Sequence, residues 1–160
     1  MLIDRTLVLS GCFGVVALFA SCVPGMQGVS PPFLMCGISA AEQKPGTVVA
    51  GQPLVLEVGP HRLVVPAGAA DAGTTFRFIV VPGAQRMVNV VQVPSVPLRA
   101  PADLSLSFSG CPTGTAESYR VWRRPDDSGQ WMRHPDKHEV IGSRVRISLR
   151  EFSTYALASN

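Results

Sequence analysis

The sequence predicts an all-β domain built as an antiparallel two-sheet β-sandwich. Three observations indicate this class: short apolar runs that alternate with period two, turn residues between these runs, and no sustained helical periodicity. The chain has 160 residues, of which 46% are hydrophobic and 16% charged, so one sizeable core is expected. Fifteen glycines and fourteen prolines favour many short strands joined by tight turns. A closed barrel is the alternative architecture.

Residues 1–21 have the character of an export signal. The run TLVLSGCFGVVALFA is apolar over about 15 residues, which suits a secretory h-region and is short of the roughly 20 residues of a membrane span. The segment LFASC that ends it resembles the lipobox of bacterial lipoproteins. This resemblance implies cleavage before Cys22 and lipid on its sulfur and new amino terminus, hence a lipoprotein anchored in the cell envelope and facing the periplasm or exterior. Cleavage near Ala20 by an ordinary signal peptidase is the alternative.

Residues 22–46 show neither the strand nor the helix period and are interrupted by prolines and glycines. We therefore expect a flexible tether over this range and the sandwich over residues 47–160. The apolar pieces of the tether, such as PPFLMC, could equally pack onto the edge of the domain. As a coil, about 25 residues would span roughly 25 to 30 Å.

The alternation begins after Gly46 with TVVAGQPLVLEV and HRLVVP. The stretch TTFRFIVVP then puts Phe76, Phe78 and Val80 on one face. LSLSFS alternates apolar residues, predicted to be buried, with serines predicted to be wet, and RVRISLR alternates apolar residues with arginines. SYRVWRR and QWMRH are predicted to be two strands joined by the turn PDDSG, and FSTYALA is predicted to be the last strand.

Three stretches of this region resemble the ZU-five domain, which is shared by zona occludens proteins, netrin receptors and ankyrins. RLVVPAGAADAGTTFRFIVVPG is similar to its Val-Pro, Gly-Ala, Thr-Thr signature, APADLSLSFSGCP to its strand of alternating leucines, and REFSTYALAS to its closing strand. The resemblance covers most of residues 48–159. It implies a β-sandwich that binds protein partners, and we expect a non-catalytic interaction or scaffold module whose partner binds in trans.

Some animal relatives in this family cleave their own chain between the Phe and Ser of a His-Phe-Ser motif. The matching positions here are Glu151, Phe152 and Ser153, so the histidine is absent. A solvated glutamate is a poor base for a serine hydroxyl, because its pKa is about 4.3. We expect no cleavage, although a self-processing or hydrolytic module that uses Ser153 or the His134 and His138 region stays open as an alternative.

The segment HPDKHE contains His134, Asp136, His138 and Glu139, which are residue types that ligate metals. Pro135 prevents the helix that would put both imidazoles on one face, so we expect a polar turn, with no metal and no cofactor. The chain contains no phosphate-binding glycine loop, no nucleophile elbow and no zinc-protease motif. We therefore expect no enzyme activity and assign no catalytic residues.

The chain carries a formal net charge of +3, and its basic residues are frequent toward the C-terminus. Arg144 and Arg146 alternate with buried positions, which predicts an exposed arginine-rich sheet face able to bind an acidic envelope polysaccharide, a lipid headgroup or a protein. The residues assigned to this face are Arg144, Arg146, Arg150, Arg120 and Trp122. A merely solvated face is the alternative, and export argues against nucleic acid as a ligand. His61, which precedes a strand, is expected to be exposed.

The cysteines leave one candidate pair. With Cys12 in the signal peptide and Cys22 lipidated, Cys36 and Cys111 remain in an oxidising compartment. A bond between them would close a loop of about 75 residues and add roughly 4 to 5 kcal/mol of stability by chain entropy. Because Cys36 falls in the expected tether, the bonded and free forms both stay open.

Overall fold

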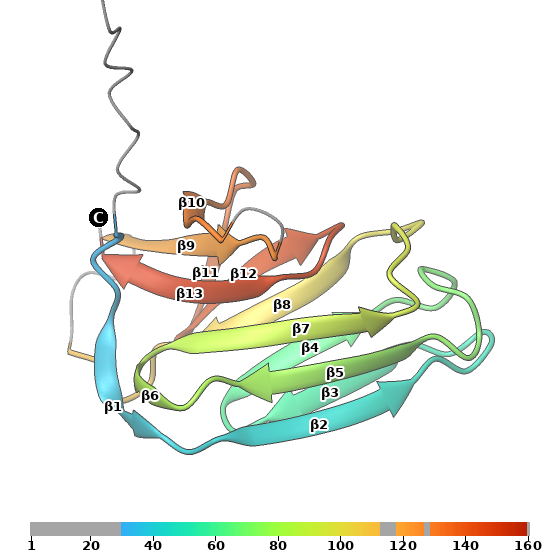
Figure 1. Ribbon diagram of the computed structural model, residues 1–160, viewed down its shortest axis with the longest axis horizontal. Coiled ribbons are helices and arrows are strands. Elements are labelled where there is room, and N and C mark those ends of the chain that lie inside the picture. Colours follow the sequence, from blue (N-terminus) through green and yellow to red (C-terminus); the bar gives the residue numbers. More distant parts are fainter. Residues whose placement is uncertain (1–29, 113–117, 127–128, 160) are drawn as a thin grey trace, which may run out of the picture.

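The computed structural model describes residues 30–112, 118–126 and 129–159, and these residues form an all-β fold in which every strand pairing is antiparallel (Figure 1). The strands are β1 (Met35–Ser39), β2 (Glu42–Thr47), β3 (Leu54–Val58), β4 (His61–Val65), β5 (Thr75–Val80), β6 (Gly83–Gln85), β7 (Met87–Val93), β8 (Ala102–Ser107), β9 (Tyr119–Arg124), β10 (Met132–Arg133), β11 (Glu139–Ile141), β12 (Arg144–Leu149) and β13 (Thr154–Ser159). No helix long and apolar enough to cross a bilayer occurs within these described ranges.

Two large sheets give the fold its sandwich-like form. One has the order β10-β9-β13-β7-β5-β2 and the other the order β11-β12-β8-β4-β3, while β1 and β6 form a small separate ribbon. In Figure 1 the six-stranded sheet lies in front of the five-stranded one. One cluster of buried side chains draws on both large sheets, so the core lies between them.

Period-two alternation correctly identifies the inward faces of the central strands. Phe76, Phe78 and Val80 of β5 are buried as predicted. The apolar positions of β12 are buried as well, and its arginines are exposed. Burying a side chain of this size stabilises a fold by about 1.5 to 3 kcal/mol, so these strands hold the two sheets together.

The alternation predicted for LSLSFS is wrong at its end. Ser107 is buried and Phe108 only partly so, although the preceding leucines are buried as expected. The backbone N–H of Ser107 donates to Nδ1 of His61 at 3.1 Å, and the Ser107 hydroxyl accepts from the Ser109 amide at 3.1 Å. These two bonds satisfy polar groups where β8 ends, so a serine is accommodated below the surface.

The expected tether over residues 22–46 is wrong for its second half, because the fold begins well before residue 47. The amide of Leu34 donates to the Leu157 carbonyl at 2.9 Å, and β1 and β2 follow. Strand β2 pairs with β5 along its whole length, at the edge of the six-stranded sheet. An edge strand is held by backbone hydrogen bonds and leaves its side chains in water, so it needs no apolar alternation and tolerates Pro45. Residues 1–29, with the predicted signal peptide, lie outside the described residues.

A disulfide joins Cys36 of β1 to Cys111, which follows β8. The sequence left this bond open because it placed Cys36 outside the domain. Instead Cys36 is buried, and the bond ties the N-terminal ribbon to the end of β8.

Candidate functional site

A surface hollow of about 430 Å³ lies between β9 and the segment that follows β10. Its charged and polar lining residues are Arg120, Arg133, His134, Asp136, Lys137 and His138, and Val121 and Pro135 complete it. We call these residues the basic hollow. Three permanent cations face one carboxylate there, so the hollow suits an anionic ligand.

The local sequence explains why these side chains meet. In β9, Tyr119 and Val121 turn into the core, so Arg120 between them turns outward. The amide of His134 donates to the Val121 carbonyl at 2.9 Å, which extends the contact between β9 and β10 by one residue. Pro135 cannot donate to a sheet ladder, and the chain leaves β9 at this point to form the rim of the hollow.

Both histidines of the hollow have a lowered pKa. Burial is the main cause for His134, and Arg123 lowers it further while Asp136 opposes the change. For His138, burial comes first, and the charges of Arg120 and Arg133 add to it. Both imidazoles are therefore neutral near pH 7.

The residue set considered for a metal does not converge on one point. Glu139 is the first residue of β11 and does not line the basic hollow, although His134, Asp136 and His138 do. Across the described residues, no cluster of three or more His, Cys, Asp or Glu side chains has a geometry able to hold a metal ion.

A second hollow, of about 290 Å³, adjoins the first and shares Lys137 and His138 with it. Here Arg146 donates through Nη2 to Oδ2 of Asp103 at 2.7 Å, and its Nη1 lies 3.9 Å from Oε2 of Glu139. The hydrogen bond to Asp103 is the main cause of a raised pKa for Arg146. Two carboxylates thus neutralise this arginine, and the second hollow is not cationic.

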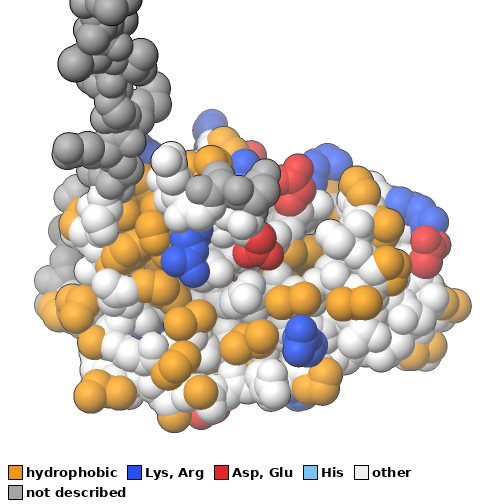
Figure 2. Space-filling view, in the orientation of Figure 1, with side chains coloured by type: hydrophobic (Ala, Val, Ile, Leu, Met, Phe, Trp, Pro, Cys, Tyr) orange, Lys and Arg blue, Asp and Glu red, His pale blue; other side chains and the backbone are white. Residues whose placement is uncertain are grey.

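The residues predicted to form an arginine-rich face do not lie on one sheet. Arg144 and Arg146 lie on β12 in the five-stranded sheet, whereas Arg120 and Trp122 lie on β9 in the six-stranded sheet. Arg150 follows β12 and lines a different hollow beside Phe152. On the face seen in Figure 2, Lys and Arg side chains are scattered, and several of them lie beside Asp or Glu side chains. The alternation along β12 correctly predicts that its arginines are exposed. It carries no information about which sheet a strand joins, so it could not assign β9 and β12 to different sheets.

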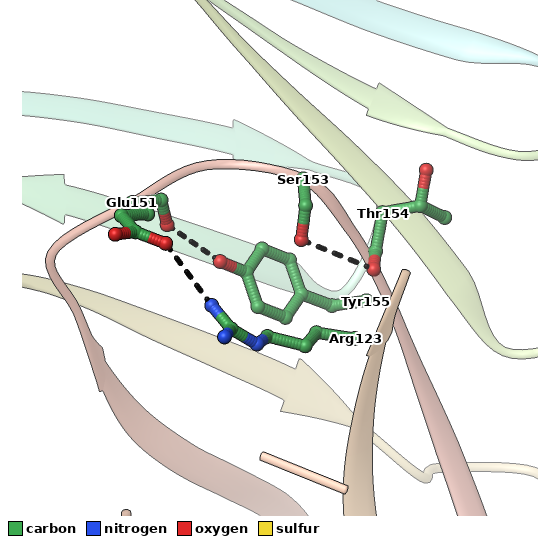
Figure 3. A network of polar contacts seen from close by, with 5 residues as sticks. All are labelled: Arg123, Glu151, Ser153, Thr154 and Tyr155. Carbon is green, nitrogen blue, oxygen red and sulfur yellow. Dashed lines mark hydrogen bonds and ion pairs between the residues drawn. The ribbon is translucent and has the colours of Figure 1, made fainter. Parts of the chain in front are cut away.

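The residues around the Phe152–Ser153 bond are engaged in internal contacts (Figure 3). Ser153 is only 5% exposed, and its hydroxyl donates weakly to the Thr154 carbonyl at 3.4 Å. Glu151, which stands at the position where the His-Phe-Ser motif has its histidine, is paired with Arg123 at 3.2 Å. Among the described residues no histidine hydrogen-bonds to Ser153. A base must be within hydrogen-bond reach of its nucleophile, so this geometry offers no activated serine.

Tyr155 closes the same network. Its hydroxyl donates to the Glu151 carbonyl at 2.6 Å, as Figure 3 shows. Burial raises the pKa of Tyr155 to about 12, although a hydrogen bond with Ser153 and the charge of Arg123 oppose the rise. The phenol therefore stays protonated and serves as a structural donor.

An aromatic cluster beside the basic hollow was missed by sequence reasoning. The rings of Phe33 and Trp131 meet edge to face with centroids 4.8 Å apart, and the guanidinium of Arg124 lies 5.3 Å from the Trp131 centroid. We call Phe33, Arg124 and Trp131 the aromatic patch. The sequence indicated only that PPFLMC, which contains Phe33, could pack onto the domain edge, and it did not pair Phe33 with Trp131.

His61 was also misplaced, since it is 1% exposed and not on the surface. It is the first residue of β4, whose burial pattern puts His61 on the same inward face as Leu63 and Val65. The alternation of HRLVV contains this signal, because His61 stands two residues before an inward leucine.

No protein-family model matches the chain, and no curated protein matches it either.

Proposed function

We propose that the chain is a membrane-anchored lipoprotein of the cell envelope whose β-sandwich, similar to the ZU-five domain, is a non-catalytic module that binds a partner in trans. The lipobox-like LFASC supports the anchor, which would be lipid on Cys22. The all-β antiparallel fold is compatible with the sandwich. The three stretches similar to ZU-five supply β4, β5, β8 and β13, which are central strands of the two sheets.

The observation that carries this proposal is a contrast between buried and exposed polar groups. The groups nearest the Phe152–Ser153 bond are held in internal contacts. The hydroxyls of Ser153 and Tyr155 donate to the carbonyls of Thr154 and Glu151. The side chain of Glu151 forms an ion pair with Arg123. Arg133 and Lys137, by contrast, are exposed at the basic hollow. Polar groups that reach solvent in a hollow are free to contact a ligand, whereas those of the Ser153 network are not.

A hydrolytic module is the second candidate, because the basic hollow brings two neutral imidazoles and Asp136 together. Acid–base catalysis needs such groups, but nucleophilic catalysis also needs an activated nucleophile. The residues that line the basic hollow include no serine, threonine or cysteine. Binding therefore accounts for the site with fewer assumptions than hydrolysis.

Two measurements test the anchor and the binding role. Intact mass of the processed protein should show acyl groups that the Cys22→Ser variant lacks, and this variant should leave the membrane fraction. In a pull-down from detergent-solubilised envelopes, the lipidated protein should retain a partner that is lost when Arg133 and Lys137 are both changed to glutamate. Changing Lys44 and Arg77 to glutamate is the matched control, since both are exposed at the opposite side of the six-stranded sheet. Equal loss of the partner with both double variants would contradict a binding role for the basic hollow.

A further inference from the structure

We propose that the corner of the fold formed by β9 and β10 docks on an anionic phospholipid surface. In this arrangement the basic hollow receives a headgroup phosphate, and the aromatic patch rests at the membrane interface. The inference rests on the proposed lipid anchor, because the anchor is what brings this corner to a bilayer.

The length of chain outside the described residues limits how far the corner can be from the membrane. Only residues 23–29 lie between Cys22 and Ser30, so eight residue-to-residue steps join the two. Fully extended, they span at most about 29 Å, and as a coil they span about 15 Å. The segment that follows is held to β13 by two backbone hydrogen bonds. The Leu34 amide donates to the Leu157 carbonyl, and the Ser159 amide donates to the Pro32 carbonyl. Whatever holds Cys22 therefore holds this side of the fold close to the lipid.

The aromatic patch lies where the described chain begins. Phe33 belongs to the segment fastened to β13, and it contacts Trp131, which directly precedes β10. Figure 2 shows hydrophobic side chains gathered on this side of the molecule. Aromatic rings are favoured at the level of lipid headgroups, and an arginine beside such a ring extends its guanidinium toward phosphate. Arg124 has this position over Trp131.

The basic hollow continues the same corner, since Arg133 of β10 lies two residues beyond Trp131. Arginine binds phosphate oxygens through its planar fork, and lysine binds them as a point charge. Arg133 and Lys137 are exposed in the hollow and lie beside Asp136, so they give it a cationic excess that one phosphate can occupy. An acidic polysaccharide fits less well, because its repeated charges would meet Asp103 and Glu139 in the adjoining hollow.

Docking should also be coupled to the protonation of His138. The charges of Arg120 and Arg133 help to keep this imidazole neutral, and a phosphate between them would oppose their effect. By linkage, docking should raise the pKa of His138 and should strengthen as pH falls. The other charged or titratable groups that face His138 across the two hollows are His134, Asp136, Lys137, Asp103, Glu139 and Arg146.

The test uses the mature chain from residue 22 with Cys22→Ser, so that any membrane binding comes from the fold. Sedimentation with vesicles of phosphatidylcholine alone, or with phosphatidylglycerol added, gives the partition coefficient. We expect binding only to the anionic vesicles, weakening with added salt. Changing Arg133 and Lys137 to serine should lower the partition coefficient about 25-fold, at about fivefold for each cation. Changing Lys44 and Arg77 to serine removes the same charge at the far edge of the sheet and should lower it less than threefold.

Circular dichroism checks that each variant is folded, and NMR of the His138 ring reports occupancy of the hollow. Equal loss of binding in the two double variants, or equal binding to neutral vesicles, would overturn the proposal. So would retention on polygalacturonate without binding to vesicles, which would assign the corner to an acidic polysaccharide. If inorganic phosphate alone shifted the His138 signals as far as vesicles at the same phosphate concentration, the hollow would be a site for the free ion. Each of these failures leaves the acyl mass and the pull-down on lipidated protein unchanged, so the proposed function is tested separately.

Discussion

The fold should lose stability between pH 7 and pH 4 through one buried histidine. His61 is 1% exposed, and its Nδ1 accepts a hydrogen bond from the Ser107 amide at 3.1 Å. Its Nε2 is buried as well and has no partner among the described residues. Burial, aided by the charges of Arg86 and Arg144, lowers the pKa of His61 from 6.5 to about 4.

The sign and size of the effect follow from proton binding. Between pH 6.5 and pH 4 the unfolded chain holds a proton on His61 and the folded chain does not, so the free energy of unfolding falls as pH falls. The full difference between 6.5 and about 4 corresponds to about 3 kcal/mol, reached below pH 4, and about 2 kcal/mol of it is lost between pH 7 and pH 5. This is a large share of the roughly 5 to 15 kcal/mol that stabilises a domain.

Urea unfolding at pH 7, 6, 5 and 4.5 measures the loss, with His61→Asn as the reference. Asparagine does not titrate, and its side-chain oxygen can accept from the Ser107 amide in place of Nδ1. The constant cost of the smaller side chain cancels when each protein is compared with itself at two pH values. The unchanged protein should lose about 2 kcal/mol more than the variant between pH 7 and pH 5. Equal losses, or an NMR titration of His61 near pH 6.5, would refute the reasoning.

Other outcomes follow from the same structure. Replacing Cys36 and Cys111 together with serine should cost about 4.5 kcal/mol in urea unfolding, because the bond closes a loop with a sequence separation of 75; a change below 1 kcal/mol would show that the bond does not constrain the unfolded chain. Tyr155→Phe removes the hydrogen bond to the Glu151 carbonyl and should lower the free energy of unfolding by about 1 kcal/mol at constant m-value. Intact mass under denaturing conditions should show an uncut chain, and a released fragment that begins at Ser153 would mean that the hydroxyl reaches the preceding carbonyl in some other conformation.

Much of the core could be predicted from local pattern. Phe76 and Phe78 of β5, and Val145 and Ile147 of β12, are buried where alternation placed them. Successive side chains of a strand point to opposite faces, so a strand with one buried face has an apolar residue at every second position. The turn before β5 was predictable for a similar local reason, since Gly68 and Gly73 adopt positive φ values of 77° and 88° there.

The edge of the fold could not be predicted in the same way. Strand β2 has exposed side chains and contains Pro45, and its pairing with β5 depends on backbone hydrogen bonds, which leave no apolar pattern in the sequence. Local alternation also carries no information about contacts between distant residues. It therefore did not show that Phe33 packs against Trp131, and it left the bond between Cys36 and Cys111 undecided.

By itself, then, the sequence determined which strands have an apolar face and which side chains of a strand point the same way, because both are properties of neighbouring residues. Only the tertiary structure decided which strands lie side by side. It separated the arginines of β9 from those of β12, buried His61 beneath the end of β8, and gathered Arg120, Arg133 and Lys137 around one hollow. Strand order depends on contacts between distant residues, and local alternation carries no information about them.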